Sequence, residues 1–150
     1  MKKYLGLVLL SLSIGLLFLS CEHQHKKAKY VFYFIGDGMG QVQVNAAEAY
    51  QAAIQKQIGF EHFAFTQFPA SGQVSTFANN RLITASAAAG TALACGKKTN
   101  IGRIGMNPDA TEPFESIAEK CKSMGMKIGI ISSVSMDHAT PAAFYAHQPS

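Results

Sequence analysis

The feature that most constrains the fold is an apolar run that ends in a cluster of glycines. Residues 30–35 (Tyr-Val-Phe-Tyr-Phe-Ile) are all aromatic or β-branched, which is typical of a strand buried on both faces of a parallel sheet. The run leads directly into residues 36–40 (Gly-Asp-Gly-Met-Gly), and an Ala- and Gln-rich segment follows from about residue 41 to 57 with Val44, Ala47 and Ala52 roughly at helical spacing. Strand, glycine turn and helix in that order predict an α/β fold.

Strand and helix patterns continue to alternate along the rest of the chain. The patterns predict short strands at 72–78 and 127–131 and helices at 86–95, at 113 to about 124, and from Pro141 onward. Gly96 and Gly125 are placed to end the first two of these helices, and Pro113 is placed to open the second. We therefore expect a mostly parallel central sheet flanked by helices, incomplete in this chain.

The N-terminus has the pattern of an export signal. Lys2 and Lys3 precede an apolar run that reaches Leu19, too short for a comfortable membrane span, so a cleaved signal peptide is favoured over an uncleaved anchor. Residues 17–21 (Leu-Phe-Leu-Ser-Cys) resemble a bacterial lipobox, in which Cys21 becomes lipidated. Phe18 stands where Leu is usual, so ordinary cleavage nearby stays an alternative.

This pattern divides the chain into three parts. We expect a signal peptide at 1–21, a polar His- and Lys-rich tether at 22–29, and a catalytic-domain portion at 30–150. The mature protein is then exported, to the periplasm or as a lipoprotein anchored to the membrane through Cys21.

The charge distribution excludes a nucleic-acid-binding surface. The formal net charge is +4, but five of the 13 Lys and Arg and one of the nine Asp and Glu precede Tyr30, which leaves eight of each in the body. A neutral body has no basic face for a polyanion. Cys95 and Cys121 are the body's two cysteines, and the sequence leaves open whether they pair or stay as small buried apolar residues.

Asp37 is the first candidate functional residue. It lies where a parallel strand ends, the edge at which α/β sheets bind ligands. A dinucleotide-binding loop is excluded because Gln41 stands where the third glycine is needed. Glycines on both sides allow a cation to approach the carboxylate oxygens, which favours metal binding. The alternative is an aspartate that only caps a turn.

Ser86 is the second candidate, in residues 84–92 (Thr-Ala-Ser-Ala-Ala-Ala-Gly-Thr-Ala). The segment lacks the flanking glycines of a hydrolase nucleophile elbow. A serine that opens a helix is often only a cap. The small residues after Ser86, however, leave space for a bulky group, and the helix N-terminus favours an anion such as phosphate.

His138 and Thr140 are the third candidate pair, in residues 137–141 (Asp-His-Ala-Thr-Pro). An imidazole and a hydroxyl lie two residues apart on a loop after a predicted strand, just before a helix. Both groups are metal ligands. A lone histidine is more often structural, so the chemistry alone leaves both interpretations open.

Together and in this order, the three blocks resemble the alkaline phosphatase family. Residues 34–40 are similar to its first metal motif, residues 83–92 to its nucleophile block, and residues 137–141 to its magnesium loop. Residues 96–100 and 102–105 continue the nucleophile block.

The resemblance implies a role for each candidate. Asp37 bridges a zinc ion and the magnesium ion, Ser86 is the nucleophile that becomes phosphoserine, and His138 and Thr140 hold the magnesium. It implies two zinc ions and one magnesium ion, hydrolysis of small-molecule phosphate monoesters at alkaline pH, and a homodimeric full-length form.

Two departures from the family pattern limit what this chain does alone. Ala85 stands where the family usually has an aspartate that orients a phosphate-clamping arginine. That arginine and most zinc ligands are expected beyond Ser150, so residues 1–150 alone are expected to be inactive. The alternatives are a truncated, inactive lipoprotein of the family, or a related hydrolase of phosphodiesters or sulfate esters; a sulfatase is disfavoured because residues 86–90 lack its Cys/Ser-x-Pro-x-Arg context.

Overall fold

A computed structural model describes residues 28–149. The signal peptide, the lipobox with Cys21 and nearly all of the predicted tether therefore lie outside the described residues. The chain forms two compact units, one ending at Ile35 and the other beginning at Gly36. The second unit contains, in order, α2 (Gln41–Ile54), the short 3-10 helix η1 (Ala64–Gln67), α3 (Ser86–Cys95), α4 (Ile117–Ser123) and α5 (Ala139–Ala142).

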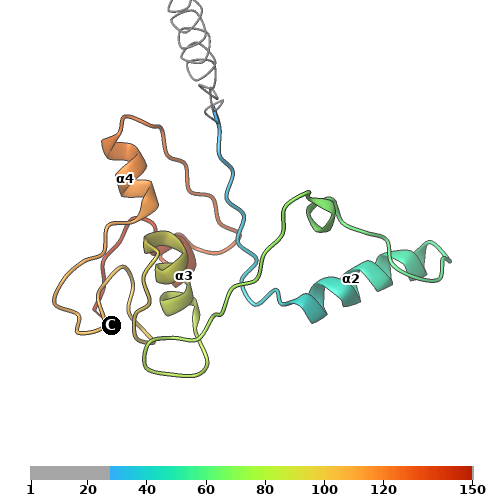
Figure 1. The fold of residues 1–150 in the computed structure, drawn as a ribbon, viewed down its shortest axis with the longest axis horizontal. Coiled ribbons are helices and arrows are strands. Elements are labelled where there is room, and N and C mark those ends of the chain that lie inside the picture. Colours follow the sequence, from blue (N-terminus) through green and yellow to red (C-terminus); the bar gives the residue numbers. More distant parts are fainter. Residues whose placement is uncertain (1–27, 150) are drawn as a thin grey trace, which may run out of the picture. The chain divides into compact units, whose positions relative to one another are not determined.

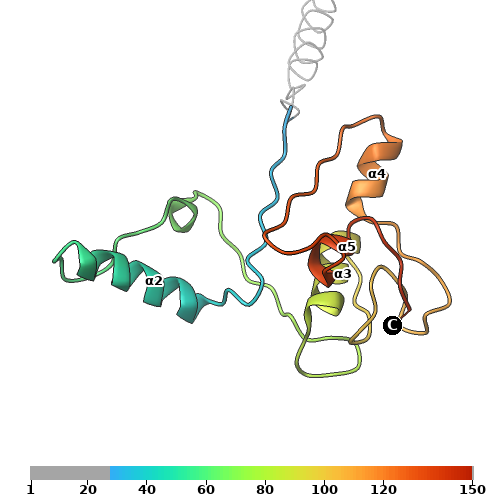
Figure 2. The ribbon, with the colours of Figure 1, turned by 180° about the vertical axis from the view of Figure 1, so that it is seen from behind.

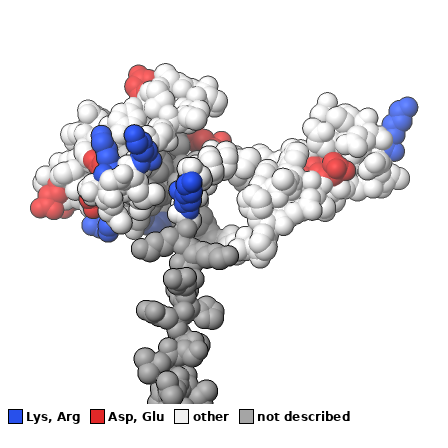
Figure 3. Space-filling model, turned by 90° about the horizontal axis from the view of Figure 1, so that it is seen from above, with Lys and Arg blue, Asp and Glu red and all other residues white. Residues whose placement is uncertain are grey.

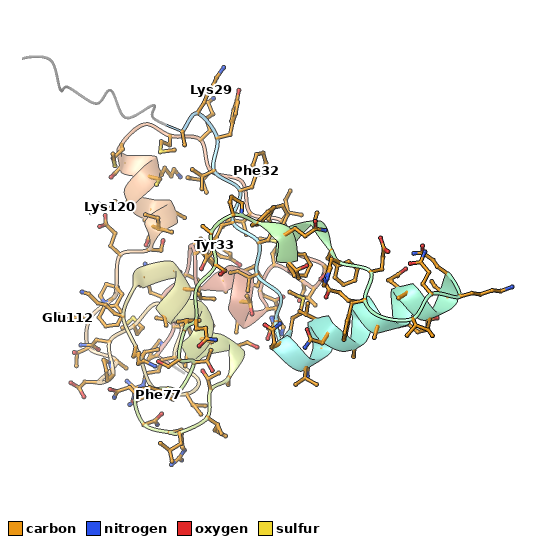
Figure 4. All side chains as sticks on the ribbon, turned by 45° about the vertical axis from the view of Figure 1, so that its right-hand side comes forward. Lys29, Phe32, Tyr33, Phe77, Glu112 and Lys120 are labelled. Carbon is orange, nitrogen blue, oxygen red and sulfur yellow. The ribbon has the colours of Figure 1, made fainter. Side chains whose placement is uncertain are left out.

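The predicted sheet is not formed within residues 28–149, where backbone pairing is limited to isolated bridges. Residues 30–35, predicted to be a buried strand, are extended and exposed, with Phe32 and Phe34 79% and 88% accessible. Figure 4 shows Phe32 and Tyr33 on this extended segment. The segment at 127–131 is likewise unpaired. Pairing and burial of these strands are therefore not confirmed within residues 28–149, because an extended segment becomes a strand only when another strand pairs with its backbone groups.

Helix α2 is held to the segment that follows it by a buried carboxylate. After α2 the chain turns back through Lys56 and Gly59, which have positive φ, and runs alongside the helix (Figure 1). Glu48 is only 3% exposed. Its carboxylate accepts hydrogen bonds from the Phe63 backbone N–H at 2.9 Å and the Thr66 hydroxyl at 2.6 Å. The sequence pattern does not predict the burial of Glu48, because helical spacing identifies a buried face only by its apolar residues.

Helices α3 and α5 pack against each other (Figure 2). Small side chains are buried on both helices, with Ala87, Ala88 and Ala94 on α3 and Ala142 on α5. Gly96 follows α3 with φ 68°, the left-handed conformation that favours glycine and ends a helix. The predicted limits of α3 are therefore confirmed.

Helix α4 begins later than predicted. Pro113 does not open it but forms a bridge with Met106. Ser116 is the N-cap, and its hydroxyl accepts from the Glu119 N–H while the Glu119 carboxylate accepts from the Ser116 N–H. This capping box has a sequence signature, Ser-x-x-Glu, that identifies the correct start. Helix α5 begins at Ala139, two residues earlier than predicted, with Pro141 inside its first turn.

Hydrogen bonds hold the C-terminal segment, residues 144–148, against the rest of the second unit. Ser116 donates its hydroxyl hydrogen to the Phe144 carbonyl at 2.8 Å, and Ile104 and Gln148 exchange backbone hydrogen bonds of 3.0 and 2.7 Å. The Thr91 hydroxyl, fully buried on α3, donates to the Arg103 carbonyl and accepts from the Gly105 N–H. These bonds fix the loop at 101–105 beneath α3.

Further observations concern the surface charges, the cysteines and the lengths of the helices. On the face in Figure 3, basic and acidic side chains are mixed rather than segregated. Cys95 and Cys121 are both free thiols, and burial, followed by the charge of Glu119, raises the pKa of Cys95. No helix in residues 28–149 is long and apolar enough to span a bilayer.

Candidate active site

Asp37 lies in a tight glycine turn that presents its side chain to solvent. The Met39 N–H donates to the Gly36 carbonyl at 3.2 Å, and Gly38 has φ 70°. Only glycine adopts that conformation at little cost. The turn between residues 36 and 40 therefore exposes the Asp37 carboxylate just before α2 begins.

Ser86 is the first residue of α3, and its hydroxyl does not cap the helix. The N-cap is Ala85, which has no side chain that could accept a hydrogen bond from the first turn. The Ser86 hydroxyl instead donates to Asp37 Oδ2 at 2.8 Å. The alternative in which Ser86 is only a helix cap is therefore wrong.

Thr140, the second residue of α5, reaches the same carboxylate oxygen. Its hydroxyl donates to Asp37 Oδ2 at 2.8 Å, although 103 residues separate the two in sequence. Asp37 Oδ2 thus accepts from two hydroxyl groups carried by two packed helices. The structure brings together three of the four predicted site residues: Asp37, Ser86 and Thr140.

These contacts lower the pKa of the Asp37 carboxyl group. The hydrogen bond from Thr140 contributes most and that from Ser86 next, partial burial opposes them, and the charge of His138 adds a smaller lowering effect. Hydrogen bonds donated to a carboxylate stabilise its ionised form. Asp37 is therefore an anionic acceptor across the neutral and alkaline range.

His138 lies at the edge of this group rather than inside it. It is the N-cap of α5 and its backbone N–H donates to the Ser135 carbonyl. Its ring is exposed and, within residues 28–149, forms no hydrogen bond with Asp37, Ser86 or Thr140.

The donor set fits one hard cation better than a zinc ion. Oxygen atoms of Asp37 and Thr140 lie close together, and magnesium prefers such ligands. Catalytic zinc uses about three protein ligands, mostly His, Asp, Glu or Cys. In the described part of the chain, no three such side chains are grouped to hold a metal, so these residues fit part of a magnesium site and do not by themselves fit a zinc site.

The N-terminus of α3 is open to an anion. No side chain caps its first turn and no acidic residue lies there. The unpaired N–H groups of a helix N-terminus carry roughly half a positive charge. Ala87 and Ala88 occupy the first turn beside Ser86, so a tetrahedral anion meets no bulky side chain of that turn.

The chain is similar to known phosphatases. The chain is 34% identical over 122 residues to alkaline phosphatase 4 of Drosophila melanogaster, covering 75% of this chain and 20% of the relative. It superposes with a TM-score of 0.69 on the cold-active alkaline phosphatase of a psychrophilic Shewanella species, at 33% identity, covering 77% of this chain and 29% of that one. A TAB5 alkaline phosphatase variant with magnesium in its M3 site gives 0.60 at 33% identity, with 75% and 30% covered.

A model of the alkaline phosphatase family matches residues 28–150. The chain belongs to the alkaline phosphatase family. It spans about a fifth to a quarter of the length of the curated relatives it matches, with 20% and 26% for two of them.

Proposed function

We propose that the full-length protein hydrolyses phosphate monoesters at alkaline pH, with Ser86 as the nucleophile. The observation that carries the proposal is the hydrogen bond from the Ser86 hydroxyl to Asp37 Oδ2 at the open N-terminus of α3. In the first step Ser86 Oγ forms a bond to phosphorus as the bond to the leaving-group oxygen breaks. Water then cleaves the phosphoserine and releases phosphate.

Asp37 orients the serine but is a poor base for it. Because its pKa is lowered, Asp37 has little tendency to take up the hydroxyl proton. Proton transfer is efficient only when the pKa values of donor and acceptor are matched. A nearby positive charge is therefore required to favour the serine alkoxide. When bound, zinc supplies that charge, and it also stabilises the leaving oxygen.

The helix N-terminus binds the phosphate but does not ionise the serine. A helix end contributes roughly 0.3–1 kcal/mol to a nearby anion. This is far less than the ionisation of a serine near neutral pH demands. Small residues in the first turn of α3 leave the space, and the N–H groups provide donors for phosphate oxygens.

For the metals we propose one magnesium ion and two zinc ions. Asp37, His138 and Thr140 would hold the magnesium on this chain, and Asp37 would also hold one zinc. Magnesium occupies the M3 site of TAB5 variants in which a histidine is replaced by glutamate or by aspartate. This supports a magnesium site in the family.

The experiment compares the full-length protein with Ser86→Ala in hydrolysis of p-nitrophenyl phosphate at pH 9 to 10, with zinc and magnesium supplied. Ser123→Ala, at an exposed serine of α4, is the matched control. We expect turnover in the wild type and the control and a loss of several orders of magnitude in Ser86→Ala, with a residual rate from direct attack by water. Equal rates in Ser86→Ala and wild type contradict the proposal.

The same assay separates the alternatives. A phosphodiesterase prefers bis(p-nitrophenyl) phosphate and a sulfatase prefers p-nitrophenyl sulfate. A vestigial lipoprotein that only binds phosphate or metal hydrolyses none of the three. Preference for the monoester is the outcome that the proposal requires.

We also propose that the protein is exported and anchored to the membrane through lipid on Cys21, and that the full-length form is a homodimer. The support for export and anchoring is the sequence of the leader and its lipobox-like end. Radioactive palmitate should label the wild type and not Cys21→Ser. A soluble mature protein that begins at another residue contradicts the anchor.

A further inference from the structure

Helix α3 lies close to α5 and its C-cap Ala143 at Gly90. This residue is buried, one helical turn after Ser86. A Cβ atom placed on Gly90 lies 3.2 Å from the Ala143 Cβ atom and 3.4 Å from the Thr140 Cα atom. Ala143 is 1% exposed, so it has little free space into which it can move. A side chain on Gly90 would therefore require one of the two helices to shift by a few tenths of an ångström.

This spacing bears directly on the site, because each helix carries one of its hydroxyl groups. Ser86 begins α3 and Thr140 lies in α5, and both donate to Asp37 Oδ2 at 2.8 Å. If the two donors move apart, Asp37 Oδ2 cannot stay at 2.8 Å from both of them. A wider separation of α3 and α5 therefore lengthens at least one of the two hydrogen bonds.

Backbone conformation does not explain a glycine at this position. Gly90 lies in the middle of α3 and is not among the described glycines with positive φ. In an ordinary helical position alanine stabilises a helix more than glycine does. A glycine here therefore indicates a packing requirement, and the nearest atoms to its missing side chain belong to α5 and its C-cap Ala143.

We propose that Gly90 is a positioning residue of the active site: its missing side chain sets the separation of α3 and α5, and so places Ser86 and Thr140 around Asp37. The inference rests on the proposed function for its effect on catalysis. Its structural part stands on the packing alone.

The test uses Gly90→Ala, Ala143→Gly and the double variant in the full-length protein. The added methyl group in Gly90→Ala requires a shift of a few tenths of an ångström. Because catalysis is sensitive to small displacements, we expect kcat/KM for p-nitrophenyl phosphate to fall about three- to tenfold, with weaker magnesium binding. Ala143→Gly removes the methyl group on the opposite helix, so the double variant should recover to within about twofold of Ala143→Gly alone.

Thermal unfolding separates positioning from general damage. Gly90→Ala should change Tm little, because the higher helix propensity of alanine offsets the cost of the close contact with Ala143, while activity and magnesium affinity fall. Unchanged kcat/KM and magnesium affinity in Gly90→Ala overturn the inference, as does a double variant no better than Gly90→Ala.

A crystallographic readout keeps this result distinct from a failure of the proposed function. If the wild type shows no Ser86-dependent hydrolysis, the proposed function fails. The separation between Thr140 Oγ1 and Asp37 Oδ2 in crystals of wild type and Gly90→Ala then tests the inference without activity. A longer separation in the variant supports it, and an unchanged separation overturns it.

Discussion

Ser86 and Asp37, 49 residues apart, share a hydrogen bond of 2.8 Å from the serine hydroxyl to the carboxylate. The same oxygen accepts from Thr140, so the carboxylate joins the start of α3 to the start of α5. Asp37 therefore holds the proposed nucleophile in one orientation before any ligand binds. The proposed role of Ser86 as nucleophile requires this orientation. The predictions below test it and the structure around it.

Replacing His138 by aspartate should strengthen magnesium binding in the full-length protein. Imidazole suits zinc or cobalt better than a hard cation, whereas a carboxylate adds an oxygen ligand and a negative charge. We expect the magnesium dissociation constant to fall by about tenfold or more, and activation by magnesium to slow. Magnesium titration followed by calorimetry measures this, and identical titrations for His138→Asp and wild type rule it out.

The ion pair between His147 and Glu119 should make stability depend on pH. His147 Nε2 lies 2.9 Å from Glu119 Oε1 and Nδ1 lies 2.9 Å from the Gly105 carbonyl, so both ring nitrogens donate when the ring is protonated. Partial burial lowers the pKa of His147, but the hydrogen bonds to Glu119 and Gly105 outweigh it and the net pKa is raised. Burial likewise raises the pKa of Glu119, but bonds from Ser116 and His147 outweigh it and the net pKa is lowered.

The signs of these shifts define the pH window. The raised pKa of His147 contributes stability that is complete below about pH 6.5 and is lost as pH rises through the folded-state value; the lowered pKa of Glu119 contributes above about pH 4.3 and is lost as pH falls further. The stability difference between wild type and His147→Gln should therefore be largest between these limits and shrink above neutrality. It should not exceed about 1 kcal/mol, because Glu119 is over a third exposed. A difference that does not change from pH 5 to 9 contradicts this.

Gly105→Ala should destabilise the protein more than the matched change Gly96→Ala. Both glycines have similar positive φ, 60° and 68°. A Cβ atom at Gly105 lies 2.5 Å from the Ala146 carbonyl oxygen and 2.7 Å from His147 Nδ1, whereas the space at Gly96 is open. Backbone strain alone costs about 1–2 kcal/mol at each site, and the clash adds about 1–3 kcal/mol at Gly105 only. Equal losses in urea unfolding contradict the close approach.

Residues 22–150 alone should show no phosphatase activity with zinc and magnesium supplied. Within residues 28–149, no three His, Cys, Asp or Glu side chains are grouped to hold a metal, so zinc should not be retained at working concentrations. The exposed apolar residues at 30–35 should also promote aggregation. Hydrolysis of p-nitrophenyl phosphate at pH 9 to 10 by this segment, absent in its Ser86→Ala variant, contradicts the prediction.

Local signals in the sequence predicted the helices well and the sheet poorly. A helix satisfies its own backbone, so Ser86 and Gly96 mark the limits of α3 without reference to other elements. The start of α4 also has a local signal, the capping box of Ser116 and Glu119, whereas Pro113 favours an earlier start. The segments at 30–35 and 127–131 depend on partners that local composition does not specify.

The candidate site could be predicted as a set of residues but not as a geometry. Asp37, Ser86 and Thr140 were selected from separate motifs, and their shared oxygen atom follows from the packing of α3 against α5. The role of Gly90 in that packing has no local signal, because a glycine among alanines reads only as a small residue. His138 was selected with Thr140, yet its ring stays outside the hydrogen-bonded group.

The most direct test of the central claim is to trap the covalent intermediate. The full-length protein is incubated with radioactive inorganic phosphate at low pH, where hydrolysis of a phosphoserine slows, then denatured, digested and mapped by mass spectrometry. The account predicts one phosphate per chain, on Ser86, and no label in Ser86→Ala. Label on another residue, or label that persists in Ser86→Ala, would show that Ser86 is not the nucleophile.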